Sequence, residues 1–351
     1  MRTFKEVFER EPEAAAEASG RVNLLGEHTD YNDGYVLPTI IPQTTRVQLA
    51  RSDDARYRFY SANLGQFVEY EDAGGPPAGF GKYVFGCIEV LRARGVAVPP
   101  VMIHIASDVP MGGGLSSSAA LEVATLRGLR TLLGVDLDEV ELAKLAQRAE
   151  IEYAGVRCGI LDQMASSLGS ANQMLFLDTR TLERKLLPLP AGELIVIDSG
   201  VARTLATSGY NERRAECELA ATLLGIKALR DEITLERSEA LPEPLNRRAR
   251  HVITENARVL EAVTGVDADR FGELMNASHA SLRDDYEVSV PPLDTLVQFL
   301  QEHPNVYGAR LTGAGFGGAC VALARDGTAA KVKADVLKRY QEAGFEGTAL
   351  V

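Results

Sequence analysis

Glycines and serines that could hold a phosphate group lie together in the segment Pro110–Ala119 (PMGGGLSSSA). Consecutive glycines let the backbone approach a ligand closely and turn several N–H groups toward one point. The serines come where a helix-patterned stretch begins, and the first turn of a helix attracts phosphate through its unpaired N–H groups and its dipole. Serine hydroxyls also suit Mg²⁺ bound to a nucleotide. The segment therefore predicts a phosphate-binding loop over Gly112–Ser118.

A flexible linker is the alternative interpretation of this loop. Linkers are flanked by other polar, weakly structured residues. Here the β-branched run Val101–Ala106 (VMIHIA) precedes the loop and predicts a strand, and Ala119–Leu133 follows it with apolar residues at helical spacing. The loop is not a Walker loop, because no Gly-Lys-Ser/Thr follows the glycines. The order strand, loop, helix favours phosphate binding.

A single acidic residue, Glu150, is a candidate metal ligand in the next predicted helix. This helix is expected to begin at a capping box of Asp136 and Glu139 and to end at Gly155. Glu150 follows Ala149 of the apolar face, so its side chain could face inward. The alternative is a solvated surface glutamate, and spacing alone favours that alternative.

Four ionisable side chains crowd the run Arg21–Asp30 (RVNLLGEHTD): Arg21, Glu27, His28 and Asp30. A turn signal, Asn32–Gly34, follows them. A neutral polyol needs several donors and acceptors at fixed positions, and short acidic side chains on a rigid turn supply them. A charged surface loop is the alternative, and it would be favoured if the run stood alone.

Asp162 lies in the otherwise apolar and small-residue stretch Cys158–Ala165 (CGILDQMA). An ionised side chain is costly to bury unless a partner pairs with it, and Arg21 is the obvious candidate. A carboxylate within reach of a sugar hydroxyl could accept its proton during phosphoryl transfer. A helix N-cap or a surface aspartate is the alternative.

A third glycine cluster, Leu311–Gly318 (LTGAGFGG), matches G-x-G-x-x-G. A dinucleotide-binding interpretation is rejected, because that motif opens a helix after a strand. Here the strand-like run Ala319–Ala324 (ACVALA) follows the glycines instead. The cluster therefore predicts a glycine-rich turn between strands that packs close to another backbone or to a ligand.

The elements that position these residues fall into two predicted domains. A chain of 351 residues is long for one core. The pattern changes near residue 185, and Glu193–Ser199 (ELIVIDS) predicts a strand that opens a new unit. We therefore expect domains over residues 1–185 and 186–351.

Charge and cysteine content narrow the possible partners and location. Acidic residues outnumber basic ones, 49 to 37, which gives a formal net charge of −12. Such a protein repels polyanions, so we expect neither nucleic acid nor a membrane as partner. A phosphate-bearing ligand would have to be held by backbone amides, a metal ion and a few placed cations. The four cysteines show no paired spacing, which indicates buried reduced thiols. Since no signal sequence or long apolar run is apparent, we expect a soluble cytoplasmic protein.

The three glycine-bearing segments, in this order and spacing, resemble the three signature motifs of the GHMP kinase superfamily. The run GRVNLLGEHTDYNDG over Gly20–Gly34 resembles the N-terminal signature of its galactokinase family. The resemblance continues through GGGLSSSAALEVA, CGILDQMASSLG, SGYNERRAECELA and LTGAGFGGACVAL, and it covers roughly residues 15–325. It implies an α+β protein with an N-terminal domain like ribosomal protein S5 domain 2, a C-terminal ferredoxin-like domain and an active site between them.

The resemblance also implies a reaction and a set of site residues. The reaction would be transfer of the ATP γ-phosphate to the C1 hydroxyl of galactose, as in the Leloir pathway, with Mg²⁺ as cofactor. Asp162 would act as base and Arg21 would stabilise the transition state. The sugar would be bound by Glu27, His28, Thr29, Asp30, Gly159 and Tyr210. ATP would be bound by Gly112, Gly113, Gly114, Leu115, Ser116, Ser117, Ser118 and Ser61, and the metal by Ser118 and Glu150.

Two alternatives to galactose phosphorylation stay open on the sequence. Kinases for related sugars, such as N-acetylgalactosamine or arabinose, generally depart from the run EHTDYNDG, which is intact here over Glu27–Gly34. A sugar sensor that has lost catalysis tends to lose part of the serine loop, and Ser116–Ala119 is complete. An active kinase, expected to be a monomer, is favoured over both.

Overall fold

The computed structural model describes residues 1–71, 76–201, 206–231 and 234–351, and for residues 206–208 it describes the backbone alone. The chain forms two units that interleave along the sequence. Unit 1 comprises Met1–Arg21, Ile41–Pro110 and Ser116–Leu168, and unit 2 comprises Val22–Ile40, Met111–Leu115 and Gly169–Val351. The boundary between residues 185 and 186 concerns family domains rather than these contact-defined units, and it stays a prediction.

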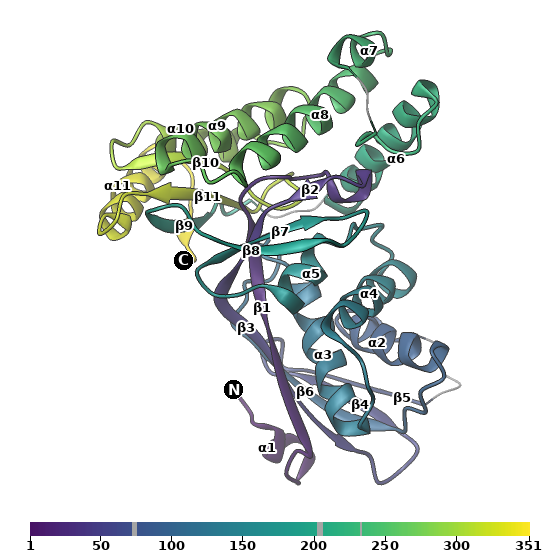
Figure 1. Cartoon of the computed structure of the whole chain (residues 1–351). Coiled ribbons are helices and arrows are strands. Elements are labelled where there is room, and N and C mark those ends of the chain that lie inside the picture. The colour runs from purple at the N-terminus through teal and green to yellow at the C-terminus, as the bar shows by residue number, and fades with distance from the viewer. Residues whose placement is uncertain (72–75, 202–205, 232–233) are drawn as a thin grey trace. The chain divides into compact units, whose positions relative to one another are not determined.

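The framework of unit 1 is a five-stranded sheet in the order β1-β3-β6-β4-β5 (Figure 1). Its strands are β1 (Ala14–Asn23), β3 (Pro38–Arg51), β6 (Val101–Ser107), β4 (Tyr57–Ser61) and β5 (Gln66–Tyr70). Strand β6 pairs antiparallel with β3 and parallel with β4. The strand predicted over Val101–Ala106 is confirmed as β6.

The helices of unit 1 are α1 (Phe4–Phe8), α2 (Gly81–Ala93), α3 (Ser117–Leu133), α4 (Glu139–Ala149), the π-helix η3 (Glu150–Ala154) and α5 (Leu161–Leu168). The helix predicted after the glycine-serine loop is confirmed as α3. The predicted capping box is wrong, because Asp138 caps α4 instead and accepts hydrogen bonds from the N–H groups of Val140 and Glu141. The turn of η3 ends at Gly155 in the left-handed conformation, as predicted.

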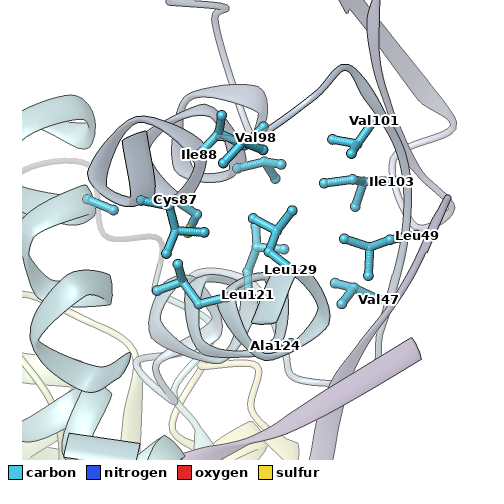
Figure 2. Packing of buried hydrophobic residues seen from close by; sticks show 14 of the residues in the cluster. Val47, Leu49, Cys87, Ile88, Val98, Val101, Ile103, Leu121, Ala124 and Leu129 are labelled. Atoms are coloured by element: carbon cyan, nitrogen blue, oxygen red, sulfur yellow. The ribbon is translucent and has the colours of Figure 1, made fainter. Parts of the chain in front are cut away.

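The core of unit 1 lies between one face of the sheet and the helices α2, α3 and α4. Alternate residues of each strand point to this face, because side chains alternate along a strand. The opposite face carries a smaller cluster in which Phe4 of α1 packs on Ala50 and Met102. Figure 2 shows the larger core, formed by Val47, Leu49, Val101 and Ile103 of the strands, Val98 before β6, and Cys87, Ile88, Leu121, Ala124 and Leu129 of the helices.

Unit 2 contains two sheets. The first is antiparallel in the order β10-β11-β9-β12, with β10 (Val306–Leu311), β11 (Ala319–Ala324), β9 (Glu193–Asp198) and β12 (Thr348–Ala349). The second has the order β2-β7-β8, with β2 (Tyr35–Val36), β7 (Gln173–Asp178) and β8 (Arg184–Pro188). The strands predicted over Glu193–Ser199 and Ala319–Ala324 are confirmed as β9 and β11.

The third glycine cluster joins β10 to β11, which confirms the predicted turn between strands. An added Cβ at Gly315 would lie 2.2 Å from the carbonyl oxygen of Val288, and Gly315 has φ +74°. Only glycine fits such a close approach to another backbone in this conformation.

The helices of unit 2 are α6 (Ala206–Leu224), α7 (Leu235–Glu239), α8 (Leu245–Ala262), α9 (Ala268–Asp284), α10 (Pro291–Gln301) and α11 (Ala329–Glu342), and the short 3-10 turn η1 (Asp30–Asn32) precedes β2. Helices α9, α10 and α11 pack directly on the sheet of β9, β10 and β11, and the other helices of the unit pack around α8. Ile195 and Ile197 of β9 share one core with Val252 of α8, Leu296 of α10 and Val336 of α11. None of the helices in the described ranges is long and apolar enough to span a bilayer.

Candidate active site

The predicted phosphate loop runs from β6 to the first turn of α3. Gly112 and Gly114 both have φ +79°, and Ser116 has φ +59° at the N-cap position of α3. These left-handed residues fold the chain tightly where a helix leaves its first N–H groups unpaired. Ser116 makes no capping bond, and its buried hydroxyl has no hydrogen-bond partner among the described residues. The loop therefore combines glycine turns, a helix N-terminus and an unused hydroxyl.

Two predicted metal ligands, Ser118 and Glu150, lie in direct contact within unit 1. Ser118 Oγ donates to Glu150 Oε1 at 2.9 Å. On the other carboxylate oxygen, Glu150 Oε2 accepts from Gln163 Nε2 at 2.7 Å. The same amide lies 3.4 Å from Glu122 Oε2. Glu150 is thus a buried side chain with both oxygens oriented, and the surface alternative is excluded.

Burial gives this cluster an unusual charge state. Burial, reinforced by the charge of Asp162, raises the pKa of Glu150 to about 7. Burial, followed by the charge of Glu150, raises the pKa of Glu122 well above its ordinary value. One oxygen of Glu122 has no hydrogen-bond partner among the described residues. Ionising either carboxyl group is costly in this buried site. A bound cation would lower that cost and would itself be stabilised by the resulting negative charge.

Arg21 and Asp162 form the ion pair that the sequence suggested. Arg21 Nε donates to Asp162 Oδ1 at 2.7 Å, and Nη2 lies 2.6 Å from the same oxygen. The arginine side chain is 5% exposed and the aspartate side chain 30%. Asp162 lies in the first turn of α5, and Arg21 lies near the end of β1. The carboxylate is therefore held by a buried cation and remains partly accessible.

Two other predicted site residues of unit 1, Gly159 and Ser61, are buried. Gly159 is buried, three residues before Asp162. Ser61 is buried at the end of β4, and its hydroxyl accepts a weak hydrogen bond from Leu64 N–H at 3.4 Å. The contacts of Gly159 with sugar and of Ser61 with nucleotide stay predictions.

Within unit 2, residues 24–34 between β1 and β2 form the signature loop, and most of them are buried. Glu27 is 5% exposed, His28 3% and Thr29 0%. Glu27 Oε2 accepts from Arg310 Nη2 and from Gly313 N–H, both at 2.9 Å. The alternative of a charged surface loop is thereby excluded.

His28 is held by a chain of hydrogen bonds in unit 2. Its Nε2 lies 3.3 Å from the carbonyl oxygen of Ala314, which can only accept, so Nε2 carries the proton. Burial lowers the pKa of His28 well below its ordinary value, so the ring is neutral and Nδ1 accepts from the Tyr31 hydroxyl at 2.8 Å. Tyr31 in turn lies 2.8 Å from the Tyr286 hydroxyl, and Cys217 Sγ lies 3.0 Å from that hydroxyl.

The remaining sugar-site predictions also gather in unit 2. The Tyr210 ring on α6 lies 5.5 Å from the His28 ring and 5.2 Å from the Tyr31 ring, between centroids. Thr29 Oγ1 lies 2.8 Å from Gly26 O and 2.7 Å from a second backbone carbonyl, so its hydroxyl closes the loop. Asp30 is partly exposed at the start of η1. Among the predicted site residues, Arg21, Ser61, Ser116–Ser118, Glu150, Gly159 and Asp162 belong to unit 1, and Glu27–Asp30, Gly112–Leu115 and Tyr210 belong to unit 2. Their contacts with ligands stay predictions.

Comparison with known proteins decides the family. Residues 2–51 match the galactokinase galactose-binding signature, residues 82–170 the GHMP kinases N terminal domain and residues 259–342 the GHMP kinases C terminal. A galactokinase of Thermotoga neapolitana is 42% identical over 330 residues, which cover 93% of each chain. A galactokinase of Roseiflexus sp. (strain RS-1) is 42% identical over 355 residues, which cover 97% of this chain and 90% of that relative. The chain belongs to the galactokinase family of GHMP kinases.

Solved structures agree with this family and its fold. The crystal structure of Lactococcus lactis galactokinase complexed with galactose matches with a TM-score of 0.92 at 36% identity, over 99% of this chain and 95% of that chain. Methanococcus jannaschii mevalonate kinase matches with a TM-score of 0.70 at 18% identity, over 95% of this chain and 96% of that chain, which shows a shared fold alone. The predicted two-domain α/β mixture of the GHMP kinase fold is confirmed.

Four buried polar residues of this galactokinase-family chain were not identified from its sequence. Glu122 and Gln163 surround Glu150 in unit 1, and Glu255 and Arg310 surround the signature loop in unit 2. Glu122 lies one helical turn after Ser118, and Gln163 directly follows Asp162, so spacing offered a local signal for these two. Arg310 and Glu255 are distant in sequence from the loop they contact, and no spacing indicates them.

Proposed function

We propose that this protein transfers the γ-phosphate of ATP to the C1 hydroxyl of galactose, giving galactose 1-phosphate and ADP. The observation that carries the proposal is the 42% identity to a galactokinase over 93% of both chains. The galactose-binding signature over residues 2–51 supports the choice of sugar. The paired Asp162 and the glycine-serine loop supply the groups that phosphoryl transfer needs.

Asp162 is the proposed acceptor for the proton of the sugar C1 hydroxyl. The oxygen of that hydroxyl attacks the γ-phosphorus of ATP, the bond from that phosphorus to the bridging oxygen breaks, and ADP leaves. The proton passes to the carboxylate of Asp162 as the new bond forms. Arg21, 2.6 Å from this carboxylate, holds it in place and offsets negative charge that develops during transfer.

The phosphates of ATP are the proposed ligands of Gly112–Ser118. The left-handed glycines and the N-terminus of α3 offer backbone N–H groups to an anion without requiring a basic surface. This arrangement explains how a chain of net charge −12 could bind a polyanion. We also propose that Ser61 contacts the nucleotide.

Ser118 and Glu150 are the proposed protein ligands of Mg²⁺. The described ranges contain no group of three or more His, Cys, Asp or Glu side chains that could hold a metal ion by themselves. Mg²⁺ commonly binds through one or two protein oxygens together with nucleotide phosphates, so this pair is sufficient. The pKa of Glu150, raised to about 7, fits a metal ligand, because a bound cation would favour the ionised form of the carboxylate. When bound, Mg²⁺ would neutralise charge on the transferring phosphate.

The sugar is the proposed ligand of Glu27, His28, Asp30, Tyr210 and Gly159, with Thr29 also at this site. Carboxylates accept hydrogen bonds from sugar hydroxyls, and an aromatic ring can pack on a sugar face. The neutral, internally bonded His28 fits a role in shaping the site. The buried hydroxyl of Thr29 fits a role in closing the loop that carries the others.

We further propose that the protein acts in the cytoplasm and as a monomer. All four cysteines are free thiols, and thiols stay reduced in that compartment. Size-exclusion chromatography with light scattering measures the oligomeric state, and a dimeric mass would contradict the monomer.

The position of the transferred phosphate tests the proposed reaction. Purified protein is incubated with ATP, Mg²⁺ and galactose, and the product is analysed by ³¹P and ¹H NMR. We expect a phosphate coupled to the anomeric proton of galactose, in amounts equal to the ADP released. A product phosphorylated at another hydroxyl, or ADP without phosphorylated sugar, would overturn the proposal.

A further inference from the structure

Arg310 of β10 is a fully buried cation close to the sugar signature. Its side chain is 0% exposed, and Nη2 donates to Glu27 Oε2 at 2.9 Å. Its Nη1 lies 3.3 Å from the backbone oxygen of Asn23 and 4.0 Å from Glu255 Oε1. Burying a guanidinium is unfavourable unless partners compensate its charge. Here two carboxylates and a backbone carbonyl lie against the two Nη atoms, while the buried Nε has no hydrogen-bond partner among the described residues. All these residues belong to unit 2.

The second carboxylate of this network belongs to Glu255 of α8. It binds the backbone N–H of Gly26, the residue directly before Glu27. Glu255 Oε1 accepts from Gly26 N–H at 2.8 Å and from the Ser278 hydroxyl at 2.7 Å. Burial pushes the pKa of Glu255 upward, but the charges of Arg258 and Arg310 outweigh burial and lower it to about 2. Glu255 is therefore ionised, and the two arginines balance the charges of the two glutamates.

Glu27 also joins the signature loop to the third glycine cluster. The oxygen that accepts from Arg310 accepts from Gly313 N–H at 2.9 Å as well. The backbone oxygen of Glu27 accepts from His251 Nε2 at 3.0 Å, so the residue is fixed at both ends. A carboxylate oxygen held by two donors has little freedom to rotate, which leaves one orientation for the rest of the group.

We propose that Arg310 is a positioning residue of the sugar site, which fixes the Glu27 carboxylate and connects the signature loop to the third glycine cluster. This inference rests on the proposed function, because it takes Glu27 as a sugar ligand. Preorganised groups bind a ligand more tightly, since they lose less freedom on binding. Arg310 never needs to touch the sugar to control its affinity.

Arg248 of α8 provides a matched control. It is a second buried arginine of unit 2, with its side chain 2% exposed, and it also contacts two carboxylates and a backbone carbonyl. Its partners are Glu216, Glu287 and Asp285 O, none of which belongs to the signature loop. Replacing it removes a similar buried charge without touching Glu27.

The test compares Arg310→Lys and Arg310→Met with Arg248→Lys and Arg248→Met. Galactose affinity is measured by isothermal titration calorimetry, and KM for galactose and for ATP by ADP release. We expect the Arg310 variants to bind galactose at least ~10-fold more weakly with KM for ATP changed by less than about twofold, since lysine keeps the charge but cannot reproduce the planar fork. The Arg248 variants should lower the thermal midpoint by a similar amount with galactose affinity within about twofold of the original protein.

Three outcomes decide the matter. Original galactose affinity in folded Arg310→Lys would overturn the positioning role. Equal losses of galactose affinity in the Arg310 and Arg248 variants would assign the effect to general destabilisation and would overturn it too. If Arg310→Met does not fold, Arg310→Lys carries the test. Failure of the unmodified protein to bind galactose at all would instead overturn the proposed function, on which this role depends.

Discussion

At the scale of single residues, Asp162 combines two properties that a proton acceptor needs. Its carboxylate lies 2.6 Å from the buried Arg21, and 30% of its side chain remains exposed. The arginine fixes the position and keeps a positive charge nearby, while the exposed part leaves room for a hydroxyl. A fully buried salt bridge would carry a larger desolvation cost and would give a substrate no access.

Replacing Asp162 by asparagine should separate chemistry from binding. The amide keeps the shape and a hydrogen bond to Arg21 but accepts no proton, so we expect kcat to fall by at least ~100-fold. Galactose affinity, measured by calorimetry, should stay within a few-fold. Asp178→Asn is the control, because Asp178 pairs with Arg230 at 2.6 Å in unit 2 and has no proposed catalytic role. Near-normal turnover in the Asp162 variant would remove this residue from its role.

Glu150→Gln should weaken the response to Mg²⁺. Glutamine can still bond to Ser118 but supplies no negative charge, so we expect the Mg²⁺ concentration for half-maximal activity to rise roughly tenfold or more. Binding of Mn²⁺ in the presence of ATP, followed by electron paramagnetic resonance, gives a readout independent of turnover. Glu152→Gln is the control, since Glu152 is exposed and pairs with Arg148. Equal Mn²⁺ affinity in both variants would contradict the metal role.

At the scale of elements, the packing of α9 on β10 depends on two glycines. An added Cβ at Gly272 of α9 would lie 2.2 Å from Tyr307 O, and one at Gly308 of β10 would lie 2.1 Å from Gly272 O. Backbone atoms cannot move aside as a flexible side chain can. The absence of side chains at this crossing lets α9 approach the strand that carries Arg310.

Gly272→Ala is therefore expected to destabilise the protein, although alanine favours helices. In an exposed helix this change would stabilise by up to ~1 kcal/mol. Here the clash with the β10 backbone should lower the free energy of unfolding by about 2 kcal/mol. Ala277→Gly, at an exposed position of the same helix, measures how much the difference in helix propensity between alanine and glycine contributes to stability. Urea unfolding measures both, and an increase in stability for Gly272→Ala would contradict the close crossing.

Elements with a strong local pattern could be predicted from the sequence. The run VMIHIA gave β6, the apolar spacing after the serine loop gave α3, and the glycines before ACVALA gave the turn between β10 and β11. The predicted start of α4 is wrong because Asp136 and Asp138 both suit an N-cap, and only the fold selects Asp138. The interleaving of the two units could not be predicted, because it depends on contacts between distant segments.

The same distinction applies to the candidate site. The sequence predicts the Arg21–Asp162 pair because a buried aspartate needs a cation, and the structure brings the two together. Family resemblance predicts Glu150 as a metal ligand, whereas spacing alone favours a surface position; the structure shows that it is buried, and its metal role stays a prediction. Arg310 and Glu255 lie more than 220 positions from the signature loop they hold. Their role arises from tertiary packing, which no local pattern encodes.

At the scale of the whole molecule, buried neutral histidines couple folding to pH. Burial lowers the pKa of His251 to about 4, and Glu255, Arg258, Arg310 and Tyr286 surround the ring. Unfolding returns the imidazole to water, where its pKa is near 6.5. Between these values the unfolded chain binds the proton and the folded chain does not. The stability contributed by His251 is therefore complete above about pH 6.5 and is lost as the pH falls toward 4.

His251→Asn should reduce the acid sensitivity of folding. From the two pKa values, His251 lowers the free energy of unfolding by roughly 2 kcal/mol between about pH 7 and about pH 5. The asparagine variant should lack this share of the decline, while other titrating groups contribute equally to both proteins. Urea unfolding at the two pH values measures the difference. An identical decline in both proteins would show that His251 does not stay neutral in the fold.

The central claim, an active kinase for galactose, is tested most directly by ADP release with a panel of sugars. Purified protein receives ATP, Mg²⁺ and, separately, galactose, N-acetylgalactosamine, arabinose or buffer. We predict rapid ADP release with galactose and far slower release with the other two sugars. Release with galactose no faster than with buffer, while another sugar is turned over, would contradict the substrate. Tight galactose binding without turnover of any sugar would instead identify a sensor.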